Sequence, residues 1–445
     1  MKPNIYHQAS VSKLIFAFGI PSILSLILEM LTGVIDTAFA GNLPGIGGEA
    51  LSAMALIAPI LGIFIALQTL FAMSSGILIS KYASDTERQQ RSYLVGVGMS
   101  TAVAFLTSVV CYLAMPHILR GLGAENEIFH LAKQYLTIQL VSNLFSSLGY
   151  TLTCCIRAFG YPKMEVVIVS CAVLVNIVFN FLLSFVLHLG IVGLAVGTLL
   201  SEMTCALFAM FFLMKRGLWL QKVPLGLRSF CHSTMELFRI GIAQTAIQVL
   251  GGCTGFFVNA RLLTLGSMIH VAAWSVVQRI YSLVLMPIVG LTQGVQSIIS
   301  YFSEDKEKTQ KISKLTMIYC SSYGILALVG MIFLGENFLS LFGGTHEMLD
   351  LAKVILFVVF LGFPFIGVLY TDMTLLQVTG HEVTSVLLIL SRQVFFLLPL
   401  IYLIPALFSM QSFGISPPMS LFLCMPLADL LATGFALLLK RKLKA

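Results

Sequence analysis

Long apolar stretches separated by short polar turns run along nearly the whole chain. Stretches at 51–80, 94–115, 166–187 and 315–334 contain few charged residues. A run of about 18 or more apolar residues is typical of a helix that crosses a lipid bilayer. The alternating segments of about ten residues that a transmembrane β-barrel needs are missing from the sequence. The pattern therefore predicts an all-α polytopic membrane protein.

Polar turns divide the chain into twelve predicted transmembrane helices. Their approximate ranges are 12–40, 51–80, 92–115, 128–152, 162–187, 190–214, 235–262, 270–302, 314–336, 348–376, 383–406 and 415–439. Several of them exceed the roughly 20 residues that cross a bilayer, so we expect tilted helices or helices that extend beyond the lipid. Each half of the chain then holds six helices.

The polar turns repeat at an interval of 220 residues. ILISKYASDTERQQ at 77–90 corresponds to SIISYFSEDKEKTQ at 297–310, and ILRGLGAENEIFHLAK at 118–133 corresponds to FLSLFGGTHEMLDLAK at 338–353. Gly160 and Gly380 fit the same interval. So long a period indicates a duplicated half and not a solenoid unit. Because each half has an even number of helices, we expect two parallel six-helix bundles related by a pseudo-two-fold along the membrane normal.

The most polar internal segment joins the two halves. It reads KRGLWLQKVPLGLRSFCHSTMELFR at 215–239. We therefore predict an N-terminal bundle at 1–214, a cytoplasmic linker at 215–234 and a C-terminal bundle at 235–445. Two similar bundles joined by one flexible strap can rock against each other around a central cavity, which is the geometry of alternating access.

The charge distribution predicts the orientation in the membrane. Charged residues make up only 10% of the chain and the mean hydropathy is +0.97, whereas soluble proteins carry about 25% charged residues. If the N-terminus is inside, 20 of the 26 basic residues lie on the cytoplasmic side, where such residues concentrate. We therefore expect both termini to be cytoplasmic, and no basic stripe suggests a nucleic-acid partner.

Several other classes of protein are disfavoured. The start of the chain has no small-residue cleavage site, and the absence of a targeting segment fits a bacterial inner membrane. The nine cysteines form no C-x-x-C pair, so buried thiols are expected and not a metal or disulfide site. There is no P-loop lysine, paired catalytic Asp, H-E-x-x-H or G-x-S-x-G motif. The sequence therefore predicts neither an enzyme nor an ATP-driven pump, and no resident cofactor.

Carboxylates within predicted helices are candidates for function, since an acid is costly to place in a membrane. Asp36 lies in LTGVIDTAFAG, and the corresponding segment of the second half, GGCTGFFVNARL, contains no acid. This asymmetry suggests a site at which a proton or sodium ion is bound and released. Glu29 precedes Asp36 by seven residues and should project from the same helix face. It is either coupled to Asp36 or hydrogen-bonded to a neighbouring hydroxyl.

The other intramembrane acids have competing interpretations. Asp372 is either a second coupling or substrate-anchoring site or a satisfied structural carboxylate. Glu202 and Asp429 are better explained as structural groups, paired with hydroxyls or with Arg392 or Arg279. The motif G-x-x-x-G at 251–255 indicates close helix packing.

Several motifs together resemble the multidrug and toxic compound extrusion (MATE) family over the whole chain. They are GIPSILSLILEMLTGVIDTAFAGNL in the first helix, EALSAMALIAPI, RAFGYPK, LVNIVFNFLL and LGIVGLAVGT. The resemblance implies a twelve-helix exporter that exchanges protons or sodium ions for amphipathic, often cationic compounds.

The resemblance also implies a set of cation-coupling residues: Asp36, Tyr135, Asn176, Asn180 and Thr198. Many members carry a second acid where this chain has Asn180, so Asp36 would be the only anionic ligand on these helices. Asn176 and Asn180 are one helical turn apart and should share a face. The oxygens of Asp36, Asn176, Asn180 and Thr198 would suit Na⁺, or the same cluster could tune Asp36 for proton exchange. Interhelical hydrogen bonding is the alternative role.

Soft and adaptable side chains are suited to a path for varied substrates. The candidates on the predicted helices, together with Glu29 and Asp372, are Met54, Gln68, Met73, Gln244, Gln248, Met286 and Gln293. The alternative is that such side chains face lipid or fill helix packing.

The combined prediction is a monomeric, cation-coupled (H⁺ or Na⁺) antiporter in the bilayer that exports small amphipathic drugs and toxic compounds by alternating access. The alternative is a lipid-linked oligosaccharide flippase with the same two-bundle plan. Such a flippase usually needs extra helices or a cationic cavity, and only Arg279 and Arg392 are predicted intramembrane bases.

Overall fold

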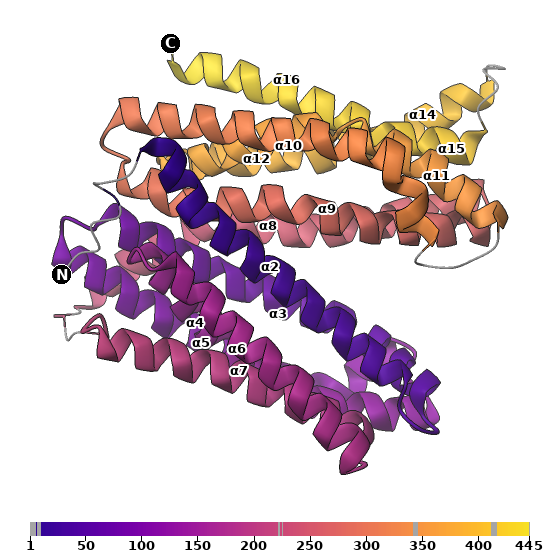
Figure 1. The fold of residues 1–445 in the computed structure, drawn as a ribbon, viewed down its shortest axis with the longest axis horizontal. Coiled ribbons are helices and arrows are strands. Elements are labelled where there is room, and N and C mark those ends of the chain that lie inside the picture. Colours follow the sequence, from indigo (N-terminus) through magenta and orange to yellow (C-terminus); the bar gives the residue numbers. More distant parts are fainter. Residues whose placement is uncertain are drawn as a thin grey trace. The chain divides into compact units, whose positions relative to one another are not determined.

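The computed structural model describes residue 6 and residues 10–220, 223–224, 226–340, 346–410 and 416–444. Within these residues every regular element is a helix and none is a strand (Figure 1). The predicted all-α class is confirmed. Lys222 of the predicted linker and the turn at 341–345 of the second repeat lie outside the described residues.

The first compact unit, called unit 1, comprises Met1–Thr245 and Ser300–Phe302. Its helices are α2 (Val11–Gly41), α3 (Gly47–Lys81), α4 (Thr86–Gly121), α5 (Asn126–Ala158), α6 (Pro162–Phe181), the π-helical η1 (Leu182–Val186) and α7 (Gly190–Lys215). Helix α8 (Leu227–Leu265) begins in this unit. It begins inside the segment predicted as linker at 215–234.

The second compact unit, called unit 2, comprises Ala246–Ile299 and Ser303–Ala445. After the remainder of α8 it contains α9 (Met268–Tyr301), α10 (Lys306–Ser340), α11 (His346–Phe360), α12 (Phe363–Val378), α13 (Glu382–Leu390), the π-helical η2 (Ser391–Leu397), α14 (Leu398–Met410), α15 (Pro417–Ser420), η3 (Leu421–Leu423) and α16 (Cys424–Lys444).

The helix bounds follow the duplication found in the sequence. Helices α10, α11 and α13 begin 220 residues after α4, α5 and α6, respectively. Gly160 and Gly380, in the turns before α6 and α13, have φ of 90° and 87°. This backbone conformation is open to glycine and strained for most other residues. The same turn chemistry therefore ends the preceding helix in both halves.

One predicted helix, at 348–376, is divided into α11 and α12, which meet at a bend of 46°. Pro364 lies in the first turn of α12. Proline has no N–H to donate, and its ring collides with the carbonyl four residues earlier, so a continuous helix is broken just before it. Gly362 lies at the break, and a Cβ there would be 2.4 Å from Oδ2 of Asp429. The bend thus gives α16 room to approach.

Among the described residues, ten helices are long and apolar enough to cross a membrane, or eleven if α11 and α12 form one span. Helix α5 is the remaining one of the twelve predicted spans. It has 33 residues but is less apolar, because it carries buried polar groups such as Gln139, Asn143, Ser147 and Thr151. Helices α3, α4 and α7 pack around it, so these groups bond to protein and need not face lipid. The chain is a multi-pass membrane protein.

Candidate functional site

Asp36 is a buried carboxylate near the C-terminal end of α2, with an exposed fraction of 8%. Its Oδ1 accepts a hydrogen bond of 2.6 Å from Nδ2 of Asn180, and its Oδ2 accepts one of 3.4 Å from the hydroxyl of Thr198. The carboxylate therefore joins α2 to α6 and α7. Sequence reasoning predicted these three residues as one cluster, and the structure brings them together.

The two asparagines of α6 extend this cluster. Asn180 Nδ2 also donates to Oδ1 of Asn176 at 3.2 Å, and both side chains are fully buried. Oδ1 of Asn180 and Nδ2 of Asn176 find no hydrogen-bond partner within the described residues. An unpaired buried acceptor is unusual. Here the unpaired oxygen belongs to the same amide whose nitrogen faces Asp36, and it lies on the side of Gly197.

Tyr135 of α5 closes the cluster on another side. Its side chain is buried and interacts with those of Gln139 and Thr198. Tyr135 also belongs to an apolar core that includes Leu136 and Leu194. The polar cluster is therefore backed by tightly packed apolar side chains, which limit how its members can move.

Two glycines of α7 allow this helix to approach α6 and η1 closely. A Cβ at Gly197 would lie 2.0 Å from Oδ1 of Asn180 and 2.9 Å from its backbone nitrogen. A Cβ at Gly193 would lie 2.6 Å from the hydroxyl of Ser184. Small residues at this spacing are typical of close helix pairs in membranes. The position of Asn180 thus depends on Gly197.

The remaining intramembrane acids differ between the units. In unit 2, Asp429 accepts from Arg392 at 2.5 Å, as the sequence suggested, and Asp372 forms an ion pair with Lys440. In unit 1, Asp36 and Glu29 have no basic partner within ion-pair distance in the described part of the chain, and the same holds for Glu202. Carboxyl groups without a basic partner are therefore concentrated in unit 1.

A sequence model of the MatE family matches residues 21–182 and 244–403, which together make up most of the chain. The chain belongs to the MatE family. The resemblance to MATE transporters found in the sequence is thereby confirmed. The two matched ranges fall one in each duplicated half. This is a family of transporters and not of enzymes.

Relatives and solved structures agree with this assignment. This MATE transporter is 25% identical to the multidrug export protein MepA of Staphylococcus aureus over 91% of its own length and 90% of that protein. Its identity to MepA of Staphylococcus haemolyticus is also 25%, over 91% and 89%.

Two solved structures share the fold. The MATE transporter VcmN of Vibrio cholerae has a TM-score of 0.88 at 18% identity, with 97% and 96% of the chains covered. A MOP superfamily transporter from Pyrococcus furiosus has a TM-score of 0.86 at 18% identity, with 99% and 97% covered. Similarity at this level of identity establishes the fold alone.

The predicted substrate-binding residues are distributed over both units of this MATE transporter. Glu29, Met54, Gln68, Met73 and Gln244 belong to unit 1, and Gln248, Met286, Gln293 and Asp372 belong to unit 2. Glu29 and Gln248 are exposed, and Met54, Met286 and Gln293 are half-buried. Gln244 is buried, and Gln68 donates to Oδ1 of Asn143 at 2.9 Å. The set does not form one cluster within either unit.

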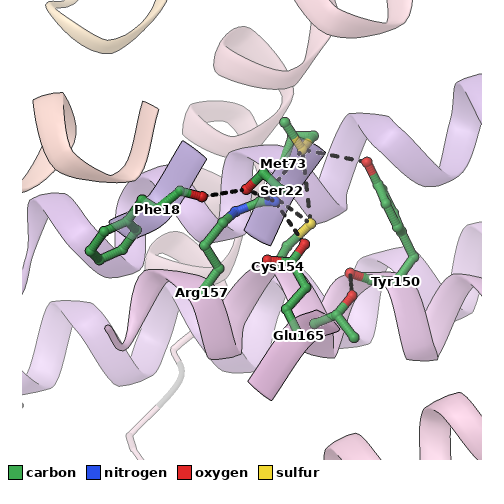
Figure 2. Close-up of polar contacts among 8 residues, drawn as sticks. Phe18, Ser22, Met73, Tyr150, Cys154, Arg157 and Glu165 are labelled. Atoms are coloured by element: carbon green, nitrogen blue, oxygen red, sulfur yellow. Dashed lines mark hydrogen bonds and ion pairs between the residues drawn. The ribbon is translucent and has the colours of Figure 1, made fainter. Parts of the chain in front are cut away.

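A second polar cluster of unit 1 was missed in the sequence (Figure 2). Arg157 was assigned to a cytoplasmic turn, but α5 extends past it and its exposed fraction is 4%. It donates to Glu165 at 2.8 Å and to the hydroxyl of Ser22 at 3.3 Å, and its other nitrogen faces Met73 and Cys154. The signal that could have revealed it is an acid eight residues downstream, across a single tight turn.

Proposed function

We propose that this MATE transporter is a cation-coupled antiporter, using H⁺ or Na⁺, that exports amphipathic and often cationic compounds by alternating access. The MepA relatives are named multidrug export proteins, which supports the substrate class. The family assignment and the arrangement around Asp36 support the coupling.

The observation that carries this proposal is the uncompensated charge of Asp36. Its carboxylate is buried and hydrogen-bonded to Asn180 and Thr198, but no basic residue of the described chain neutralises it. A charged group in a membrane is costly unless it is paired. A proton or sodium ion that binds Asp36 supplies the missing positive charge. A cation that binds Asp36 therefore stabilises unit 1 more than a cation that binds a carboxylate already paired with a basic residue.

The side chain of Asn180 defines what must change when a cation binds. Its amide nitrogen now faces Asp36, and its oxygen lies over Gly197 without a partner. A bound Na⁺ needs oxygen ligands, and a protonated Asp36 needs an acceptor. If the amide of Asn180 turns so that Oδ1 faces Asp36, this oxygen can bind Na⁺ or accept a hydrogen bond from the protonated carboxyl group. We infer that this rotation, together with Thr198, separates the loaded state from the empty one.

Alternating access requires that the cation and the exported compound each stabilise a different conformation of the transporter. A cation bound at Asp36 from outside stabilises the inward-facing arrangement, and the exported compound stabilises the return. A ligand shifts such an equilibrium only by the difference in its affinity for the two states. Since cation and cargo favour opposite states, movement of one down its gradient drives export of the other.

The test is ethidium transport in proteoliposomes under an imposed proton gradient and, separately, a sodium gradient. We expect Asp36→Asn to abolish gradient-driven transport while the protein folds normally. The matched control is Asp85→Asn, the same chemical change at an exposed turn of unit 1, where asparagine is also a good helix cap. Gradient-driven transport that persists in Asp36→Asn would falsify the mechanism.

The flippase alternative has less support. A lipid-linked pyrophosphate needs free positive charge inside the membrane. Of the two predicted intramembrane bases, Arg392 is paired with Asp429, which leaves Arg279 on its own. The named relatives are export proteins for drugs. Both observations favour the exporter.

A further inference from the structure

A groove on unit 1 runs between α2 and α6, two helices that pack against each other. Its volume of about 650 Å³ lies within the range of about 300–1,000 Å³ typical of small-molecule sites. Phe16, Ile20 and Leu24 of α2 and Val167 of α6 line it, and all four are exposed. The groove is therefore apolar over most of its length and open to the surroundings of the unit.

Two lysines lie at one end of this groove. Lys13 is in the first turn of α2 and Lys163 is in the first turn of α6, and both side chains are exposed and line the groove. Neither has a carboxylate within ion-pair distance in the described chain. The N-terminus of a helix adds partial positive charge to that of the side chains. This end of the groove therefore attracts an anion.

The order of residues along α2 separates the charged end from the apolar part. Lys13, Phe16, Ile20 and Leu24 recur at helical spacing on one face, so the apolar surface continues from the lysine toward the middle of the span. The lysines are on the side where the sequence predicts the cytoplasm. Anionic lipids concentrate in the cytoplasmic leaflet and attract basic residues near the membrane surface.

We propose that this groove binds one anionic phospholipid of the cytoplasmic leaflet. Lys13 and Lys163 hold its phosphate headgroup, and an acyl chain lies along Ile20, Leu24 and Val167. A zwitterionic phospholipid would cover the same apolar surface, but its own ammonium group cancels the charge of its phosphate, so it would bring no net negative charge to the two lysines. The selectivity for an anionic headgroup is thus assigned to the two lysines.

The test uses a tryptophan reporter in the groove. Val167→Trp is introduced into the full chain after Trp219→Phe and Trp274→Phe remove the two native tryptophans. The protein is reconstituted in nanodiscs of phosphatidylcholine that contain a small fraction of brominated phosphatidylglycerol or brominated phosphatidylcholine. We expect the phosphatidylglycerol to quench the reporter far more strongly at equal mole fraction.

The charge-reversal variant Lys13→Glu/Lys163→Glu should reduce this preference by up to about 30-fold, since each lysine near a membrane surface contributes about a factor of five. The matched control is Lys215→Glu/Lys314→Glu, which makes the same charge change at exposed lysines on the same predicted side, outside the groove. The control should retain the preference. Equal quenching by the two lipids, or a preference that survives Lys13→Glu/Lys163→Glu, would overturn the proposal.

Discussion

Gly197 is the residue whose size most directly sets the geometry around Asp36. The oxygen of Asn180 occupies the space that a Cβ at this position would fill. A larger residue must either push α7 away from α6 or turn the amide of Asn180. Both movements alter the 2.6 Å hydrogen bond to Asp36.

We therefore expect Gly197→Ala to reduce coupled transport at least tenfold and to lower the free energy of unfolding by about 1–3 kcal/mol, the usual effect of overpacking. The matched control is Gly98→Ala in α4, where a Cβ meets nothing within 4 Å. It should be neutral or slightly stabilising, since alanine favours a helix. Thermal unfolding in detergent and ethidium efflux measure the two effects. Wild-type transport in Gly197→Ala would contradict the assigned role.

The pair formed by Arg157 and Glu165 is a second place where one residue matters for stability. Both side chains are buried, and a buried pair that loses one partner is destabilised by about 3–5 kcal/mol. We expect that loss for Glu165→Gln in denaturant or thermal unfolding, and a smaller loss for Arg157→Met/Glu165→Leu. The control is Glu87→Gln: Glu87 is exposed and paired with Arg91, and the effect should be about 0–1 kcal/mol. Equal losses of unfolding free energy in Glu165→Gln and Glu87→Gln would contradict a stabilising role of the buried pair.

At the residue scale, the sequence was sufficient for the Asp36 cluster but not for the Arg157 cluster. Asp36, Asn180 and Thr198 lie in motifs that resemble the MATE family, and the resemblance placed them in one set. Arg157 lies beyond the predicted helix at 128–152, in the turn before the next predicted helix, because the apolar pattern fades before it. The burial of Arg157 depends on Glu165 and Ser22, which come from other helices, and no local pattern reports such a contact.

Among the elements, the repeated polar turns have a shared structural role. The backbone N–H of Arg88 donates to Asp85 at 3.1 Å, and that of Lys308 donates to Asp305 at 3.0 Å. Each aspartate therefore caps the helix that follows, α4 or α10. A short polar side chain at the N-cap stabilises a helix because it accepts a hydrogen bond from a free backbone N–H group. This role explains why both halves have an aspartate at the same position of the polar turn.

The cap of α10 should depend on pH. The backbone N–H of Lys308 lowers the pKa of Asp305 below its usual value. A carboxylate with a depressed pKa in the folded state stabilises the fold above the unfolded pKa of about 4 and loses this contribution as pH falls through the folded value. The protection of amides in the first turn of α10 against hydrogen exchange, measured relative to their intrinsic exchange rates, should therefore fall below about pH 4. Asp305→Asn keeps a capping side chain that does not titrate, so its protection should not depend on pH in this range. Identical pH profiles for the wild type and Asp305→Asn would contradict the role of Asp305 as a titrating cap.

The sequence also predicted most element bounds, but it missed features that depend on a neighbouring element. Pro364 was visible in the sequence, but the break at Gly362 also reflects the approach of Asp429. The G-x-x-x-G motif at 251–255 predicted close packing, but a Cβ at Gly251 would meet nothing within 4 Å. Close approaches lie instead at other glycines, among them Gly197 and Gly362. A small residue permits close contact only where a second helix packs against it. The local sequence around the glycine does not show which helix, if any, packs there.

At the scale of the whole molecule, the duplicated halves differ in how their intramembrane acids are paired. The predicted acids of unit 2 each have a basic partner, whereas Asp36 of unit 1 does not. The pairing of the intramembrane acids therefore differs between the halves, although the helices keep corresponding bounds.

This asymmetry predicts different outcomes for two similar substitutions. Asp372 is already paired with Lys440, so Asp372→Asn should retain gradient-driven ethidium transport within about threefold of wild type, whereas Asp36→Asn should lose it. Proteoliposomes with imposed gradients measure both. Loss of coupling in Asp372→Asn, in a protein that unfolds at the wild-type temperature, would place a second ion site in unit 2.

The gapless interval between the halves has a consequence for engineering. Helix α5 spans residues 126–158, and α11 with α12 spans 346–378, so the two segments have the same length and are joined to their neighbours at corresponding positions. Transplanting the straight segment into the place of the bent one would therefore leave every connecting turn unchanged. Such a chimera would show what the bend contributes to the packing of α16, which contacts Gly362 at the break through Asp429.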